Sequence, residues 1–154
     1  MITDDILKRQ CEESGWPCVA RTSGRLTVAL EATPAVQAVV ALSGSGVRVF
    51  ASLLELDAGA AVCCEAISML LRKAGALVHR VRAVTEENFG FEVNFPTLPS
   101  PEELHDTFCC LSVACGLVGA ELPALLDDRA AQDFILVRGW AADVSTPTLN
   151  QQGD

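Results

Sequence analysis

A chain of 154 residues, half of them hydrophobic, is long enough to bury a core as one domain and too apolar to be disordered. Its formal net charge of −9 and its lack of tyrosine argue against binding phosphate backbones or stacking on bases. No run of about 18 apolar residues predicts a transmembrane helix, and the acidic N-terminus does not resemble a signal peptide. We expect a cytoplasmic protein with no nucleic-acid partner and no membrane partner.

The first 56 residues predict one helix and two antiparallel hairpins. A threonine before two aspartates starts a helix over residues 3–14, which Gly15 stops. Turn-forming residues at 22–24 and at 43–46 each separate two strand-like runs. The glycines of the second turn precede a strand and lack the lysine of a phosphate-binding loop, so they indicate a turn.

The strand expected over residues 47–56 has apolar residues on both faces. One face carries Val47, Val49 and Leu53, and the other carries Phe50 and Leu54. Such a strand lies either at the centre of a sheet or beneath a partner. We therefore select Phe50 and Leu54 as candidate residues of a partner or dimer surface.

The middle of the chain predicts a helix followed by a third hairpin. Asp57 should cap a helix over residues 58–74 that ends at Gly75. Residues 76–84 then form a strand that places His79 at an exposed edge. The residues after the turn at 85–88 alternate between apolar and polar in "FGFEVNF", which is typical of a half-buried strand.

A long C-terminal helix is expected to begin after Ser100. Ser100 is the N-cap, a proline follows it, and Glu103 completes a capping box. An apolar stripe then recurs every three or four positions, at Leu104, Phe108, Leu111, Cys115, Val118, Leu122 and Leu125. The helix should end near Asp127 and Asp128.

Together these elements predict an α+β fold. The order is a helix, four strands, a second helix, a β-hairpin and the long C-terminal helix, with short turns that make the strands antiparallel. We expect a single domain over residues 1–140 and a flexible C-terminal tail over residues 141–154.

The seven cysteines are interpreted mainly as core residues. Cys109, Cys110 and Cys115 lie one, five and six positions apart, so no two of them share a helix face. His105 precedes Cys109 by four positions, which allows a two-ligand edge but not a closed zinc site. Cysteine packs as a small hydrophobe when buried. We expect no metal, no cofactor and no disulfide, and a thiol- or metal-dependent role remains the alternative.

Catalysis is not indicated by any motif. A cysteine nucleophile needs a base, and the only two histidines are His79 and His105. No serine stands in a nucleophile elbow. The paired acids have ordinary interpretations as turn residues, a helix start and a helix end. We therefore predict no catalytic residues and no enzymatic activity.

The long C-terminal helix also carries a face of small residues. Ser112, Gly116 and Gly119 lie with Ala120 away from the apolar stripe. Each interior glycine costs about 1 kcal/mol of helix propensity, so two in one helix indicate close approach of another backbone. That backbone belongs either to the same domain or to a partner, and we include Ser112, Gly116 and Gly119 in the candidate surface.

The order of elements resembles the type III secretion chaperone-like fold, which includes the class I secretion chaperones and the YbjN-like proteins. The resemblance rests on "AAVCCEAISMLLRKAG", on "HRVRAVTEENFGFEVNFP" and on "SPEELHDTFCCLSVACGLVGAELPALL", and it covers roughly residues 3–127. It implies a homodimer without enzymatic activity that binds an extended segment of a protein partner. We therefore expect a cytosolic, chaperone-like protein-binding domain.

Overall fold

The computed structural model describes residues 1–57 and 59–139 and has the α+β architecture that the sequence predicts. Helix α1 (Asp4–Glu13) precedes two hairpins, which are formed by β1 (Cys18–Thr22) with β2 (Arg25–Ala29) and by β3 (Gln37–Ser43) with β4 (Gly46–Glu55). Helix α2 (Ala61–Leu77), the hairpin of β5 (Arg82–Glu86) and β6 (Asn88–Phe95), and helix α3 (Pro101–Gly119) follow. A 3-10 turn η1 (Leu122–Leu126), helix α4 (Asp128–Phe134) and a π-helical turn η2 (Ile135–Gly139) complete the described chain.

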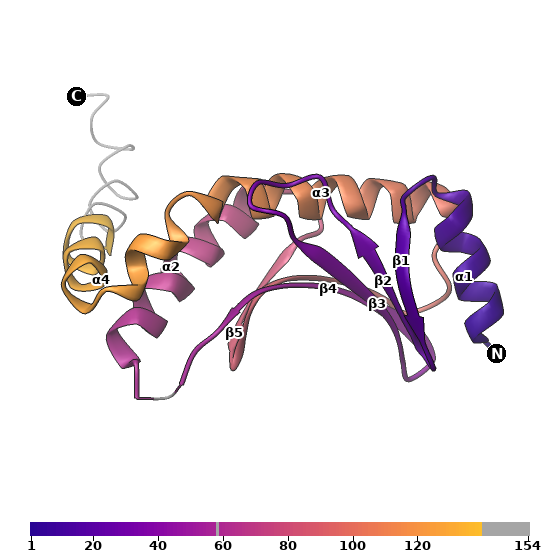
Figure 1. Ribbon diagram of the computed structural model, residues 1–154, viewed down its shortest axis with the longest axis horizontal. Helices are drawn as coiled ribbons and strands as arrows, with labels where there is room; N and C mark the ends of the chain where they lie inside the picture. Colours follow the sequence, from indigo (N-terminus) through magenta and orange to yellow (C-terminus); the bar gives the residue numbers. More distant parts are fainter. Residues whose placement is uncertain (58, 140–154) are drawn as a thin grey trace, which may run out of the picture.

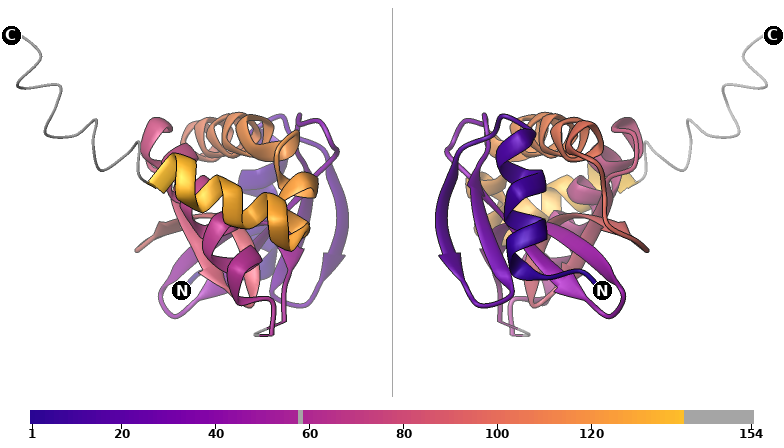
Figure 2. Two further views of the ribbon diagram at one scale, coloured as in Figure 1. Left: turned by 90° about the vertical axis from the view of Figure 1, so that its left-hand side faces the viewer. Right: turned by 90° about the vertical axis from the view of Figure 1, so that its right-hand side faces the viewer.

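All six strands belong to one antiparallel sheet in the order β1-β2-β3-β4-β6-β5. The strands arch beneath α3, with α1 beside one end and α2 and α4 beside the other (Figure 1). The end views show the same one-sided arrangement of helices and sheet (Figure 2). Among the described residues, no helix covers the face of the sheet that is turned away from α3, and we call this the open face.

The core lies between the sheet and α3. Phe91, Val40 and Val49 of the sheet and Phe108 and Leu111 of α3 are all fully buried. The stripe expected from the sequence is buried along its whole length, from Leu104 to Leu125. The prediction that the cysteine of this stripe packs as a core residue is confirmed, since Cys115 is 1% exposed.

Helix α3 begins as predicted but ends earlier. The Ser100 hydroxyl accepts a hydrogen bond from the Glu103 N–H at 3.1 Å, and the Glu103 carboxylate accepts one from the Ser100 N–H at 3.0 Å. The predicted single helix breaks after Gly119, and Leu122 and Leu125 reach the core from η1. Asp127 ends η1 rather than α3, and its side chain accepts from the Ala130 N–H and caps α4.

Two boundaries in the middle of the chain were wrong. Helix α2 starts at Ala61 and its N-cap Ala60 has no side-chain cap, because Asp57 receives the Ala60 N–H on its main-chain oxygen instead. The helix continues through Gly75, which is buried within it. His79 lies in an exposed turn rather than in a strand, because α2 extends to Leu77 and β5 begins only at Arg82.

Over residues 89–93, strand β6 is buried on both faces rather than on one. Phe89, Phe91, Val93 and Phe95 face the core as predicted, but the alternate residues Gly90 and Glu92 are buried as well. A side chain at Gly90 would collide with the main chain of β4. The predicted tail 141–154 lies outside the described residues.

Candidate functional site

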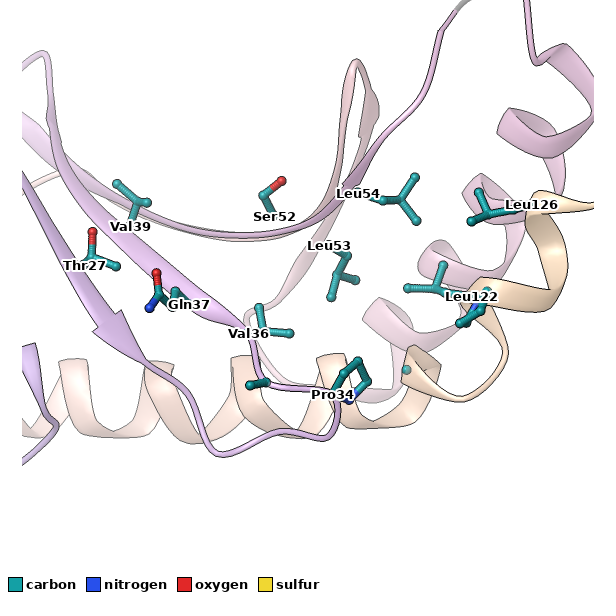
Figure 3. Close-up of a pocket in the computed structure, with 13 residues that line it drawn as sticks. Thr27, Pro34, Val36, Gln37, Val39, Ser52, Leu53, Leu54, Leu122 and Leu126 are labelled. Atoms are coloured by element: carbon teal, nitrogen blue, oxygen red, sulfur yellow. The ribbon is translucent and has the colours of Figure 1, made fainter. Parts of the chain in front are cut away.

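An apolar groove of about 680 Å³ lies where β4, the connection between β2 and β3, and η1 meet (Figure 3). Thirteen residues from these segments, from β2 and β3 and from the end of α3 line it: Thr27, Pro34, Ala35, Val36, Gln37, Val39, Ser52, Leu53, Leu54, Gly119, Leu122, Pro123 and Leu126. None of these side chains is charged, although a fifth of the whole chain is. The groove is therefore suited to apolar groups and to neutral hydrogen-bonding groups.

Among residues 1–57 and 59–139, one side of the groove is a strand edge without a neighbour. The pairing of β3 with β4 ends at Ala38 opposite Ala51, because the chain before Gln37 turns away toward α3. Residues 52–55 of β4 continue beyond this point and pair only with β6. Their other edge faces the groove and offers main-chain hydrogen-bonding groups.

A β-bulge changes the position of one predicted surface residue. The register between β4 and β6 shifts between Ser52 and Leu54, which places Leu54 opposite Phe89. Phe50 pairs with Glu92, and residues at this position in the sheet point to the face opposite Phe89. The prediction that Phe50 and Leu54 share one face is therefore wrong, because a bulge inserts one extra residue and reverses the alternation. Leu54 lines the groove, and Phe50 lies on the open face.

Two of the small residues on α3 are covered by the chain itself. The Ser112 hydroxyl accepts a hydrogen bond from the Glu31 N–H at 3.1 Å. A Cβ on Gly119 would lie 2.6 Å from the carbonyl oxygen of Thr33. The connection between β2 and β3 thus packs on α3 and forms one wall of the groove. Ser112 is therefore not available to a partner, which corrects its assignment to a partner surface, and Gly119 is covered by this connection except where it lines the groove.

The third small residue, Gly116, is exposed. Apart from its chain neighbours and the backbone of its own helix, no atom of the described residues lies within 4 Å of the position that a Cβ would take there. Its neighbours on the outer side of α3 are apolar, with Val113 at 56% and Leu117 at 48% exposure. The outer side of α3 is thus a smooth apolar strip, which we call the α3 strip and define as Val113, Gly116 and Leu117.

His105 connects the start of β1 to α3 through its ring. Its Nδ1 accepts a hydrogen bond from the Trp16 indole N–H at 3.0 Å, and its Nε2 lies 3.6 Å from the Cys109 sulfur. An indole N–H only donates, so the neutral ring carries its proton on Nε2. That nitrogen faces the thiol and has no free lone pair with which to accept the thiol proton. His105 and Cys109, which the sequence suggested as two possible metal ligands, are therefore in contact. They are not arranged as a nucleophile with its base.

The electrostatics of the cysteines agree with a packing role. Burial raises the pKa of Cys11 and the pKa of Cys115 to about 12 each. Burial, and next the neighbouring Cys110, raise the pKa of Cys109. Reactive and metal-binding cysteines need the opposite shift, toward the thiolate. Within residues 1–57 and 59–139, no three His, Cys, Asp or Glu side chains gather closely enough to hold a metal ion.

Over the same residues, no helix has both the length and the hydropathy needed to cross a bilayer.

Comparison with known proteins adds no relative: no family model, no curated protein and no solved structure matches this chain.

Proposed function

We propose that this chain is a non-enzymatic, cytosolic, chaperone-like domain that binds an extended apolar segment of a partner protein in the groove. The observation that carries the proposal is an uncharged groove beside the free edge of β4 at residues 52–55. An added strand gains main-chain hydrogen bonds from such an edge, and pockets beside the edge take its alternate side chains. The resemblance in element order to the secretion chaperones supports the same function.

The groove favours a polypeptide over a small molecule as the occupant. Sites for small molecules enclose most of the ligand surface. This groove is open along one side, where Leu126 remains 52% exposed. An extended chain fills an open groove without needing to be enclosed, because its main chain continues past both ends.

We propose further that the domain acts as a homodimer through the α3 strip. Val113 and Leu117 bracket Gly116, whose missing side chain leaves room for a second helix to approach closely. A two-fold dimer brings the same strip of each copy together and covers it.

Peptide selection tests the binding function. A phage library of random 12-residue peptides is selected on the purified full chain, and the best peptide is labelled for fluorescence polarisation. We expect enrichment of aliphatic and aromatic residues. Leu126→Asn should weaken binding by about tenfold or more, since it removes an apolar contact. Leu136→Asn is the matched control, because Leu136 is 65% exposed and does not line the groove. If no peptide is enriched, or if both variants bind like the wild type, the proposal fails.

The mass in solution tests the homodimer. Light scattering at micromolar concentration should give twice the chain mass. Gly116→Leu should lower that mass toward the monomer without lowering the helix content, because the added side chain meets only the second copy. A monomeric wild type would refute the homodimer and leave the groove unaffected.

A further inference from the structure

The open face of the sheet carries a group of arginines beside the groove. Arg25 and Arg48 lie in one row across the strands, since both stand opposite Ala41 of β3. Arg82 lies in the next row, opposite Glu92. The whole chain carries only 11 basic residues against 20 acidic ones, so three arginines on one face form a local exception to its charge.

Two of these arginines are held in place by one buried acid. Glu92 is 7% exposed, and its two carboxylate oxygens lie 2.7 Å from the Arg48 side chain and 3.5 Å from the Arg82 side chain. The Arg48 guanidinium also lies over the Phe50 ring, 4.5 Å from its centre. One carboxylate balances only one of the two guanidinium charges. Arg48, Arg82 and Glu92 together therefore carry a net charge of one positive unit, and Arg48 is already held in position.

Arg25 adds a second positive charge to this end of the face. Its side chain makes no ion pair with any residue that the structure describes. It lines a hollow of about 330 Å³ together with Arg48 and Phe50. The acidic residue of the hollow, Glu55, lies at the opposite end of β4 from Arg48. The arginine end is thus basic by itself, because surface charges that far apart are screened from each other.

The hollow adjoins the groove. Val39 and Ser52 line both of them, so a segment that leaves the groove across these two residues enters the hollow. The groove takes uncharged groups, and the hollow offers guanidinium groups beside an aromatic ring. A ligand that matches both has an apolar part followed by carboxylates.

We propose that the hollow beside the groove binds an acidic stretch of the partner segment, whose carboxylates contact Arg25 and Arg48. This inference rests on the proposed function and names the chemistry of the segment that the groove takes. The Arg48 guanidinium, which is fixed by Glu92 and Phe50, loses little side-chain freedom on binding a carboxylate, and with Arg25 it selects the partner by its charge. The occupant is a protein segment rather than a nucleic acid, because the groove next to the hollow has no basic side chain to neutralise a phosphate backbone.

The 12-residue peptides selected on the wild type test the inference. They should be enriched in Asp and Glu on one side of the apolar residues. A copy of the best peptide with its acids replaced by Asn and Gln should bind the wild type about tenfold more weakly, the factor that corresponds to about 1.4 kcal/mol. A 12-residue oligothymidylate should bind more weakly than the acidic peptide.

Arginine variants then locate the effect. In the Arg25→Gln variant, the ratio of the affinities for the acidic and the neutral peptide should shrink to about threefold or less. This loss is expected if Arg25 and the acidic side chains of the peptide interact directly. Arg48→Lys keeps a positive charge beside Glu92 but loses the planar fork, and it should also reduce the difference. Arg72→Gln is the matched control, because Arg72 is exposed on α2 and lines neither the groove nor the hollow. Circular dichroism verifies that each variant is folded.

The outcomes separate this inference from the proposed function. Equal binding of the acidic and neutral peptides to the wild type would overturn the acidic stretch and leave the groove function in place. The same holds if the difference persists in both Arg25→Gln and Arg48→Lys, or if the oligothymidylate binds more tightly than the peptide. A library that yields no binding peptide would overturn the proposed function, and the acidic stretch with it.

Discussion

Gly116 and Gly119 make a matched pair of positions for a stability test. Both lie in α3, three residues apart, and both would become alanine in the test. A Cβ at position 116 meets nothing within 4 Å. A Cβ at position 119 meets the Thr33 carbonyl oxygen at 2.6 Å and the Pro34 ring at 2.8 Å. The two substitutions therefore share one chemical change and differ in the space around it.

The expected magnitudes follow from these distances. Alanine is preferred over glycine inside a helix, so Gly116→Ala should raise the free energy of unfolding of the monomer by about 0.5–1 kcal/mol. At position 119 the contact with Thr33 is shorter than real Cβ contacts allow, and its partner is main chain that moves only with its segment. Overpacking of this kind costs about 1–3 kcal/mol. We expect Gly119→Ala to be less stable than Gly116→Ala by about this amount.

Urea unfolding followed by far-UV circular dichroism measures the difference. With a slope of about 2 kcal/mol per molar urea, the two midpoints should differ by about 0.5–1.5 M. A Gly119→Ala variant as stable as Gly116→Ala would show that the connection between β2 and β3 does not pack on α3, which would remove one wall of the groove. The comparison is made at a chain concentration at which light scattering gives a monomer, where a Gly116→Ala variant less stable than the wild type would show that another segment of the same chain covers Gly116.

Three further predictions concern the core, the start of α3 and alkaline pH. Phe91→Ala and Leu111→Ala should each lower the free energy of unfolding by about 2–5 kcal/mol in urea titrations, because both side chains are fully buried, and an unchanged midpoint would place that element wrongly. Ser100→Ala should cost about 1 kcal/mol by loss of the capping box, whereas Ser100→Asp should retain most of the stability; equal losses in both variants would contradict the capping role. Folding raises the pKa of Cys11 and the pKa of Cys115 from 9.0 to about 12, so the folded state holds these protons more tightly than the unfolded state does. These two thiols should therefore leave the free energy of unfolding unchanged below pH 9 and should lower it as pH rises from 9 toward 12. The thermal midpoint across pH 8–11 measures this fall, and a Cys115→Ala variant with the same pH profile as the wild type would contradict the contribution of that thiol.

Local patterns in the sequence determined the type and order of the elements as far as α3, but not the break after Gly119 or the presence of α4. The capping box at Ser100 and the alternation from Phe89 to Phe95 depend only on residues within a few positions of each other. Such signals act through helix period, strand period and main-chain hydrogen bonds, so neighbouring residues suffice to predict them. The boundary errors have a local cause too: Asp57 has the right chemistry for a cap, but its main chain rather than its side chain meets the Ala60 N–H.

Only the tertiary structure decided which surfaces are available to a partner. Gly116 and Gly119 look alike in the sequence, and they differ because residues about 85 positions earlier pack on one and not on the other. Leu54 changes faces through a bulge that depends on how β4 pairs with β6. The groove combines residues from 27–54 with residues from 119–126, and the arginine hollow depends on the register of four strands. Helix and strand periods place a side chain on a face, but the segment that covers that face is chosen by long-range packing, which no local pattern encodes.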